Sequence, residues 1–390
     1  MTKIEYTVRF LTPAFLGNAE QSGQWRTPPF KALLRQWWRV VYAAEHSFRA
    51  NAAEMRQEEG KLFGHAWLDE DRDSHGQKVA ARKSLVRIRL DRWDEGKLKS
   101  WQPLTTVKHP EVRFPVGSDL YLGYGPVTLP RGANQPKLKA NAAIQADESA
   151  TLSLAVPEEE APRIRRALWL MDRYGTLGGR SRNGWGSFSM VPLPLEEGKG
   201  DGRVPTGGVP LRDWNKCLDR DWPHAIGKDD RGPLIWQTAK AYEDWKTLMR
   251  DLAIIKIGLR TQFVFPSVQP PHATVEPRHW LSYPTTTHKV RDWQKKKLRL
   301  SNSLRFKVRP DEGSPKKLRG VIFHVPCLPP PEFNPNPNRY AIEATWQTVH
   351  ALLDELCKPG GRTYGMISHQ DRRSKLKPDL DKVTLERVKE

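Results

Sequence analysis

The stretch from Arg26 to Tyr42 constrains the fold more than any other part of the sequence, because it specifies one helix with two different faces. Pro28 and Pro29 suit the first turn of a helix, where their missing N–H groups are not needed, and Thr27 is expected to cap it. Apolar residues then recur at helical spacing, at Phe30, Leu33, Leu34, Trp37 and Val41. Such a stripe predicts a helix that packs on a core.

The neighbouring face of this helix is basic. Lys31, Arg35 and Arg39 recur every four residues, Trp38 lies at the border of the two faces, and Arg26 stands at the start. No acidic residue interrupts the stretch. One interpretation is a solvated face whose long side chains cover apolar surface. The other is a surface for a polyanion such as RNA, which the positive end of the helix dipole favours.

The charge of the whole chain favours the polyanion. Its 390 residues contain 64 Lys and Arg against 45 Asp and Glu, a net charge of +19, together with 15 Trp. Such an excess indicates nucleic acid as a partner, and aromatic rings beside cations suit stacked bases. The three Cys are far apart, which argues against a zinc ribbon or a disulfide framework. We expect no metal, no cofactor, no membrane span and a cytoplasmic location.

Hydrophobic periodicity predicts a mixed fold in the first half of the chain. Strands are expected at residues 4–10, 84–90, 151–156 and 185–191, and helices at 26–42, 43–61 and 158–177. The main elements then follow the order β-α-β-β-α-β, which is the ferredoxin-like pattern. A sheet of this kind leaves one face free of helices, and RNA-recognition modules use that face or the loops around it.

The length allows two domains. The expected first domain covers residues 1–194 with a Gly- and Pro-rich insertion around 91–141, and a linker follows at 195–208. A second domain is expected over 209–370 and a charged tail over 371–390. Within the second domain, residues 233–251 are predicted to be helical and 253–264 to form a strand. The order of the elements predicted in the second half weakly repeats that of the first half. This repetition predicts an α+β fold of tandem ferredoxin-like (RRM-like) domains with long insertions.

A second candidate for anion binding is the glycine-rich stretch that begins at Gly175, with five Gly in 12 residues. Its glycines permit positive φ and expose backbone N–H groups, but no G-K-[ST] ends it, so it is not a P-loop. The alternative is a helix C-cap followed by a hairpin. The candidate RNA-binding residues here are Gly178, Gly179, Arg180, Arg182, Asn183 and Trp185.

Two further features leave their alternatives open. Residues 289–319 contain 12 Lys or Arg against three acids, and a phosphate track and a solvated loop fit them equally. No residue pattern marks a catalytic site. A metal-independent ribonuclease needs a His and a cation, and His46 and His65 lie near the basic helix in the sequence. Surface histidines are common, so this is a weak signal.

Four motifs, in their order, resemble the RAMP superfamily of CRISPR systems, and most nearly the first RAMP subunit of Cmr, or type III-B, effector complexes. The motifs are T-P-A-F-L-G at 12–17, R-T-P-P-F-K-A-L-L-R-Q-W-W-R at 26–39, L-F-G at 62–64 and G-G-R-S-R-N-G-W-G-S-F at 178–188. The resemblance implies tandem ferredoxin-like domains. It also implies an RNA-binding subunit of a ribonucleoprotein, with guide RNA, target RNA and other RAMP subunits as partners, near the 3′ end of the guide.

By the same resemblance, Arg26, Lys31, Arg35 and Arg39 face RNA, and residues 178–185 form the glycine-rich loop. RAMP subunits that cut target RNA carry an Asp in the loop after the first strand, whereas residues 11–27 contain Glu20 as their one acid. We therefore expect a non-catalytic subunit. The alternatives are a metal-independent endoribonuclease that processes repeat RNA, and a structural adaptor whose basic faces contact acidic subunits.

Overall fold

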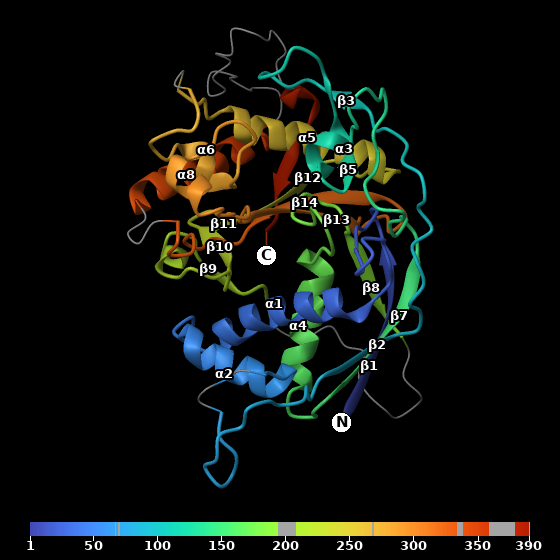
Figure 1. The fold of residues 1–390 in the computed structure, drawn as a ribbon, viewed down its shortest axis with the longest axis vertical. Coiled ribbons are helices and arrows are strands. Elements are labelled where there is room, and N and C mark those ends of the chain that lie inside the picture. The colour runs from blue at the N-terminus through green and yellow to red at the C-terminus, as the bar shows by residue number, and fades with distance from the viewer. Residues whose placement is uncertain are drawn as a thin grey trace. The chain divides into compact units, whose positions relative to one another are not determined.

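The chain folds into helices and several small sheets, which confirms the predicted α+β class (Figure 1). The computed structural model describes residues 1–66, 68, 71–193, 208–266, 269–333, 338–358 and 379–389. Nearly all of the predicted linker and part of the predicted tail therefore lie outside the described residues. No helix among the described residues is long and apolar enough to cross a membrane.

Contacts divide the chain into two compact units. The first contains residues 1–100, 140–181 and 185–210, and the second contains 101–139, 182–184 and 211–390. Residues 101–139, which belong to the predicted insertion, thus cluster with the second unit rather than with the sequence around them. Each unit has a four-stranded sheet of its own.

The sheet of the first unit has the order β2-β7-β1-β8, and all neighbouring strands are antiparallel. Its strands are β1 (Thr2–Phe10), β2 (Arg87–Leu90), β7 (Ser149–Val156) and β8 (Phe188–Pro192). Helices α1 (Thr27–Glu45) and α4 (Ala161–Tyr174) pack against each other on one face of this sheet (Figure 1). Leaving α2 and the small elements aside, the chain order is the predicted β-α-β-β-α-β.

Alternation places the core of this unit between the sheet and the two helices. Ile4 and Val8 of β1 are buried, whereas Lys3 and Arg9 are exposed on the other face. The apolar stripe predicted for α1 is buried throughout. The predicted Thr27 cap is wrong: Arg26, with extended backbone angles, is the N-cap residue and no side chain caps the helix.

The predicted helix over residues 43–61 is also wrong, because two helices share that range. Helix α1 ends at Glu45, and Ser47 and Phe48 adopt positive φ and reverse the chain. Helix α2 (Ala52–Phe63) then starts afresh at Asn51, whose side chain forms a capping box with Glu54. A helix continued from α1 would leave those capping groups unused. The reversal places α2 beside α1.

The glycine-rich stretch forms a turn that leads from α4 into β8. The backbone N–H of Leu177 donates to the carbonyl of Gly186 at 2.9 Å, so the stretch closes on itself as a hairpin. Gly186 has φ +64°, and a Cβ placed there would lie 1.9 Å from the carbonyl oxygen of Leu177. This position requires glycine for both its conformation and its space.

Replacing Gly186 by Ala is therefore expected to destabilise the protein by about 2–4 kcal/mol, measured by urea unfolding. The matched control is Gly76→Ala, since Gly76 also has positive φ but no atom within 4 Å of the added Cβ. That control is expected to cost about 1 kcal/mol. Equal losses for the two variants would contradict the close approach at Leu177.

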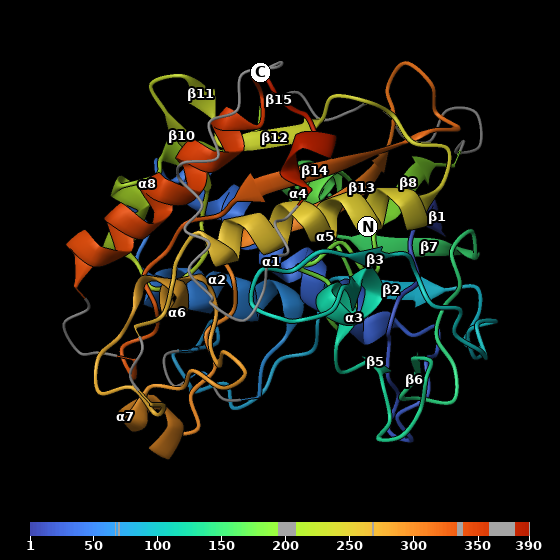
Figure 2. The ribbon, with the colours of Figure 1, turned by 90° about the horizontal axis from the view of Figure 1, so that it is seen from above.

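The second unit repeats the same strand and helix order. Its antiparallel sheet has the order β13-β14-β12-β15. The strands are β12 (Ile235–Thr238), β13 (Leu304–Pro310), β14 (Leu318–His324) and β15 (Leu385–Arg387). Helix α5 (Trp245–Thr261) follows β12 and α8 (Arg339–Glu355) follows β14, and both lie on the same side of this sheet (Figures 1 and 2). The last strand comes from the predicted tail.

The strand predicted at residues 253–264 is wrong, because most of that range is the second half of α5. Its run of Ile254, Ile255 and Ile257 favours a strand by composition. The range is nevertheless helical, because Asp244 caps α5 and because nearly all of the side chains in this half of α5 are buried.

The remaining elements are short. In the first half of the chain they are β3 (Thr106–Val107), β4 (Val116–Gly117), α3 (Ser118–Gly123), β5 (Val127–Thr128) and β6 (Lys137–Leu138). In the second half they are β9 (Leu211–Asp213), β10 (Ile226–Asp229), β11 (Gly232–Pro233), α6 (Pro277–Leu281), α7 (Arg291–Lys295) and the 3-10 turns Lys216–Asp219 and Leu380–Lys382.

Candidate nucleic-acid interface

The basic face of α1 has an acidic partner that its own sequence does not show. Glu59 of α2 accepts a hydrogen bond from Arg35 Nε at 3.0 Å and two from Arg39 at 2.9 Å each. The Glu59 side chain is 4% exposed, while those of Arg35 and Arg39 are 36% and 39% exposed. One buried carboxylate therefore anchors both arginines, and their side chains still reach solvent.

Lys31, the third cation of the row, is held at the end of α2. Its Nζ donates to the carbonyl of Phe63 at 2.9 Å, where the negative end of the α2 dipole lies. Burial, and to a lesser extent the nearby Arg35, lower the pKa of Lys31. Three cations against one carboxylate leave a net charge of +2 on this face. These three cations, Lys31, Arg35 and Arg39, are called the α1 row below. The α1 row is therefore partly neutralised but remains positive.

Arg26 and Trp38 are also predicted RNA contacts, but their surroundings differ from those of Lys31, Arg35 and Arg39. Arg26 is half-buried at the helix start, and its Nε is buried with no hydrogen-bond partner among the described residues. Trp38 is fully buried, with its ring stacked on Tyr42 and edge-on to Phe63. The guanidinium of Arg163 stands over the same ring. In this conformation the Trp38 ring has no free face for a base.

The glycine-rich stretch divides between the two units. In the first unit, Gly178 and Arg180 are exposed, and both have positive φ. The N–H of Gly179 donates to the carbonyl of Phe15 at 3.0 Å. Trp185 is fully buried, with its ring 5.5 Å from that of Phe15. The part of this stretch that faces solvent is therefore the tip around Arg180.

Arg182 and Asn183 make contacts inside the second unit. Arg182 Nη1 donates to the carbonyl of Asn302 at 2.8 Å, and burial lowers the pKa of its guanidinium. Asn183 is buried, donates to the carbonyl of Leu122 at 2.6 Å and accepts from Lys256 Nζ at 2.5 Å. These contacts give both residues structural partners.

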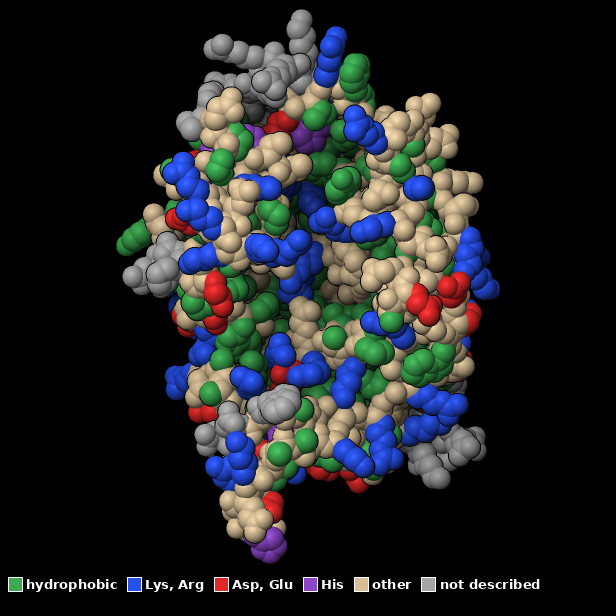
Figure 3. Space-filling model, in the orientation of Figure 1, with side chains coloured by type: hydrophobic (Ala, Val, Ile, Leu, Met, Phe, Trp, Pro, Cys, Tyr) green, Lys and Arg blue, Asp and Glu red, His purple; other side chains and the backbone are tan. Residues whose placement is uncertain are grey.

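The third basic stretch, residues 289–319, does not behave as one surface. Arg305, Lys307 and Arg309 of β13 are buried, whereas the lysines at 295–297 are exposed around the end of α7. Arg319 is paired with Asp311. Over the face of the molecule in Figure 3, Lys and Arg side chains are widely spread and Asp and Glu are fewer.

The two histidines of the ribonuclease alternative, His46 and His65, differ in their contacts and exposure. His65 Nδ1 accepts the N–H of Leu68 at 3.3 Å, so its Nε2 donates to Asp71, 2.6 Å away. The Arg82 guanidinium, more than His65, holds the pKa of the buried Asp71 far below its ordinary value. His65 is therefore committed to a structural contact. His46 is exposed, and its ring stacks on Tyr42.

Sequence reasoning missed Glu59, although a signal for it exists. In α2 the buried side chains are Met55, Glu59, Leu62 and Phe63, which lie on one stripe at helical spacing. An acid within an apolar stripe, close in sequence to a helix face that carries only basic charges, indicates a buried counter-ion. Among the described residues, no group of three or more His, Cys, Asp or Glu side chains could hold a metal ion.

Residues 7–189 match the model of the RAMP superfamily, the family that the motifs of the sequence resemble. The matched residues include the α1 row and the glycine-rich stretch. A search of curated protein sequences finds no match.

Three solved structures show what the chain is similar to. One is Cmr1 from Pyrococcus furiosus in its apo form, with 15% identity, 83% of this chain and 88% of that chain covered, and a TM-score of 0.38. Another is a chain of the type III-B Cmr-beta complex bound to cognate target RNA and AMPPnP, with 10% identity, coverages of 90% and 99%, and a TM-score of 0.45. A chain of a type IV-B CRISPR complex has 12% identity, coverages of 53% and 95%, and a TM-score of 0.31. Because these scores are low, the likeness to the RAMP superfamily rests on the match of residues 7–189.

Proposed function

We propose that this chain is a non-catalytic RNA-binding subunit of a type III-B CRISPR RNA-guided interference complex. It contacts guide RNA and target RNA near the 3′ end of the guide and assembles with other RAMP subunits in the cytoplasm. The observation that carries the proposal is the RAMP match over residues 7–189, because it includes both the α1 row and the glycine-rich stretch. The net charge of +19 agrees with an RNA partner.

The proposal includes tandem ferredoxin-like domains. In both units the first and third strands are central, in the order second-third-first-fourth, and this order supports the proposal. We take the first domain as residues 1–194 and the second as 209–370, joined by a linker at 195–208. The segment 101–139 joins the second domain, and the tail ends in the strand β15 that completes the second sheet.

The RNA contacts that we propose are the half-exposed and exposed cations. Arg35 uses only its Nε in the pair with Glu59 among the described residues, so its two terminal nitrogens remain for phosphate oxygens. Lys31 and Arg39 lie one turn before and one turn after Arg35 on α1, and Arg26 is the N-cap residue of this helix. Gly178, Gly179 and Arg180 form the tip of the loop, and Arg182 and Asn183 hold its base. Trp38 and Trp185 support these contacts by packing.

The non-catalytic role is proposed from two features. The first is the lack of Asp in residues 11–27 of the sequence. The second is the commitment of His65 to Asp71, which leaves its ring nitrogens unsuited to proton transfer. No observation favours the metal-independent endoribonuclease over this role.

Arg180→Glu tests the proposal at its most exposed cation. The variant is expected to bind single-stranded RNA about fivefold more weakly and to reduce the slope of log K against log salt by about 0.7, because one phosphate contact is lost. Fluorescence anisotropy at several salt concentrations measures both quantities. The control is Lys97→Glu, an exposed cation of the same unit outside the proposed contacts, which should leave the slope unchanged. Wild-type protein that shows no salt-sensitive RNA binding would contradict the proposal.

A further inference from the structure

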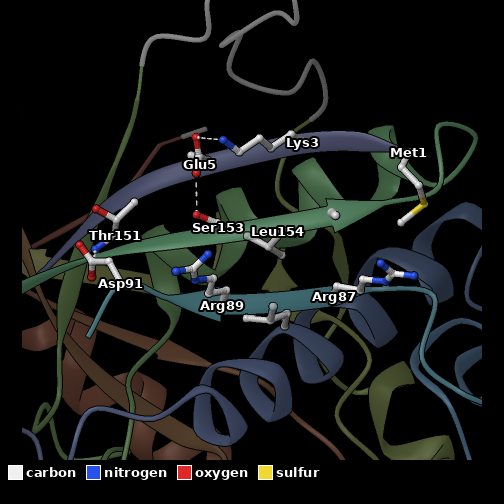
Figure 4. Close-up of a pocket in the computed structure, with 11 residues that line it drawn as sticks. Met1, Lys3, Glu5, Arg87, Arg89, Asp91, Thr151, Ser153 and Leu154 are labelled. Carbon is white, nitrogen blue, oxygen red and sulfur yellow. Dashed lines mark hydrogen bonds and ion pairs between the residues drawn. The ribbon is translucent and has the colours of Figure 1, made fainter. Parts of the chain in front are cut away.

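The sheet of the first unit carries a hollow on the face opposite to α1 and α4. Its volume is about 600 Å³, and Figure 4 shows the residues that line it. All of them come from β1, β2, β7 and the residues next to these strands, so the hollow lies within the first unit. Neither the α1 row nor the glycine-rich stretch contributes to it.

Strand pairing arranges the lining side chains in rows across the three strands. One row joins Lys3 of β1, Ala155 of β7 and Arg87 of β2. At the usual strand spacing, the Cα atoms of Lys3 and Arg87 lie about 9–10 Å apart. Ala155 lies between them and has only a methyl side chain, which leaves space between the two cations.

The next row joins Glu5, Ser153 and Arg89. Glu5 accepts hydrogen bonds from Lys3 Nζ at 2.8 Å and from Ser153 Oγ at 2.6 Å, as Figure 4 shows. These bonds, that of Lys3 first, lower the pKa of Glu5, so it is ionised at neutral pH and balances Lys3. Arg89 takes no part in this network.

Arg87 and Arg89 are exposed, and within the part of the chain that the structure describes neither has an ion pair or a hydrogen bond from its side chain. They are two residues apart on one strand, so they project from the same face about 6.6 Å from each other. One further acid lines the hollow: Asp91, which accepts the N–H of Thr151 at 2.8 Å. Three cations against two acids leave a charge of +1.

We propose that this face is a second RNA-contacting surface, on which Arg87 and Arg89 bind two phosphates of one single strand. This inference rests on the proposed function. A guanidinium pairs with phosphate oxygens through two parallel hydrogen bonds, and two free guanidiniums in a row can follow a strand. No aromatic ring occurs among the described lining residues, so the surface takes the backbone and not the bases. It therefore differs from the sheet face of RNA-recognition modules, which stack bases.

The test is the double variant Arg87→Glu/Arg89→Glu in the full chain, measured by anisotropy with labelled single-stranded RNA over a salt series. We expect affinity to fall about tenfold for every RNA sequence and the salt slope to fall by about 1.4, about 0.7 for each lost phosphate. Arg87→Lys/Arg89→Lys keeps both charges and should keep the slope. If the Lys pair loses as much as the Glu pair, charge is not the cause and the inference is overturned.

The matched control is Lys97→Glu/Lys99→Glu, which makes the same change of charge two residues apart in the same unit but outside the hollow. Equal losses in the control and test variants overturn the inference, because net charge alone then explains them. If wild-type protein binds RNA and the Arg87/Arg89 variant binds it equally well, the inference fails while the proposed function stands. If that variant keeps RNA but loses co-purified protein subunits, the face belongs to an acidic protein partner. Wild-type protein that binds no RNA overturns both.

Asp91→Asn gives an independent readout with the opposite sign. Asn keeps an oxygen that can accept the N–H of Thr151 but removes a negative charge from the rim of the hollow. RNA affinity is expected to rise about threefold in low salt. Unchanged or weaker binding at an unchanged unfolding midpoint would overturn the inference.

Discussion

Replacing Glu59 by Gln is expected to tighten RNA binding by about three- to tenfold, although it removes a buried ion pair. Glu59 accepts three hydrogen bonds from Arg35 and Arg39, and both side chains still reach solvent. A neutral Gln no longer competes with phosphate for the two guanidiniums. Anisotropy over a salt series should therefore show a steeper slope together with a higher affinity. The fold should lose about 1 kcal/mol of stability.

Glu58→Gln is the matched control for this prediction. Glu58 is the neighbouring acid on the same helix, is exposed and is paired with Lys61 at 3.0 Å, so its replacement changes the net charge equally. The control is expected to leave the salt slope near that of the wild type. Identical behaviour of the two variants would mean that the α1 row is a solvated, structural face and not an RNA contact.

Acidification from pH 7 to pH 5 is expected to destabilise the second unit strongly. Burial lowers the pKa of His109, His224 and His279 to about 4 and of His350 to about 3, and that of His324 well below its ordinary value. In the unfolded chain these rings take up protons near pH 6.5, so the unfolded state binds more protons below that pH. Stability is therefore fully present above about pH 6.5 and is lost as the pH falls toward 4. The expected loss is on the order of 1 kcal/mol per pH unit for each histidine.

Hydrogen exchange of amides in the second unit, followed from pH 7 to pH 5 with correction for intrinsic rates, measures this loss. A parallel series in 0.5 M salt is the control, because salt screens repulsion within a chain of net charge +19 but does not change the burial of the histidines. His109→Asn should reduce the slope of the unfolding free energy against pH by the equivalent of about one proton. A stability that stays flat between pH 7 and pH 5 would contradict the buried neutral histidines.

The sequence predicted the fold best where periodicity and end signals agreed. The stripe of α1 and the strand β1 stand where they were expected, because alternation and helical spacing directly encode which side is buried. Errors arose where a local signal was read without its neighbours. The Ile run of α5 predicts a strand when read by itself, and the helix predicted at 43–61 starts too early because its start ignores the capping pair Asn51 and Glu54.

The candidate site was harder to predict because its electrostatics come from distant residues. The sequence shows the α1 cations, but Glu59 meets them only after the chain reverses at Ser47 and Phe48. Likewise, the burial of Trp38 depends on Phe63 and on Arg163 of α4, which spacing within α1 does not reveal. The positions of Arg87 and Arg89 depend on a register that only the paired sheet defines.

Purifying the tagged chain from its own cells, and sequencing the RNA that comes with it, tests the central claim most directly. The account predicts guide RNA derived from CRISPR repeats, together with a fixed set of other RAMP subunits, and a weaker yield of that RNA from the Arg180→Glu chain. RAMP subunits that assemble equally well without RNA would support the adaptor alternative instead. Bulk RNA of mixed sequence with no stable protein partner would contradict the account.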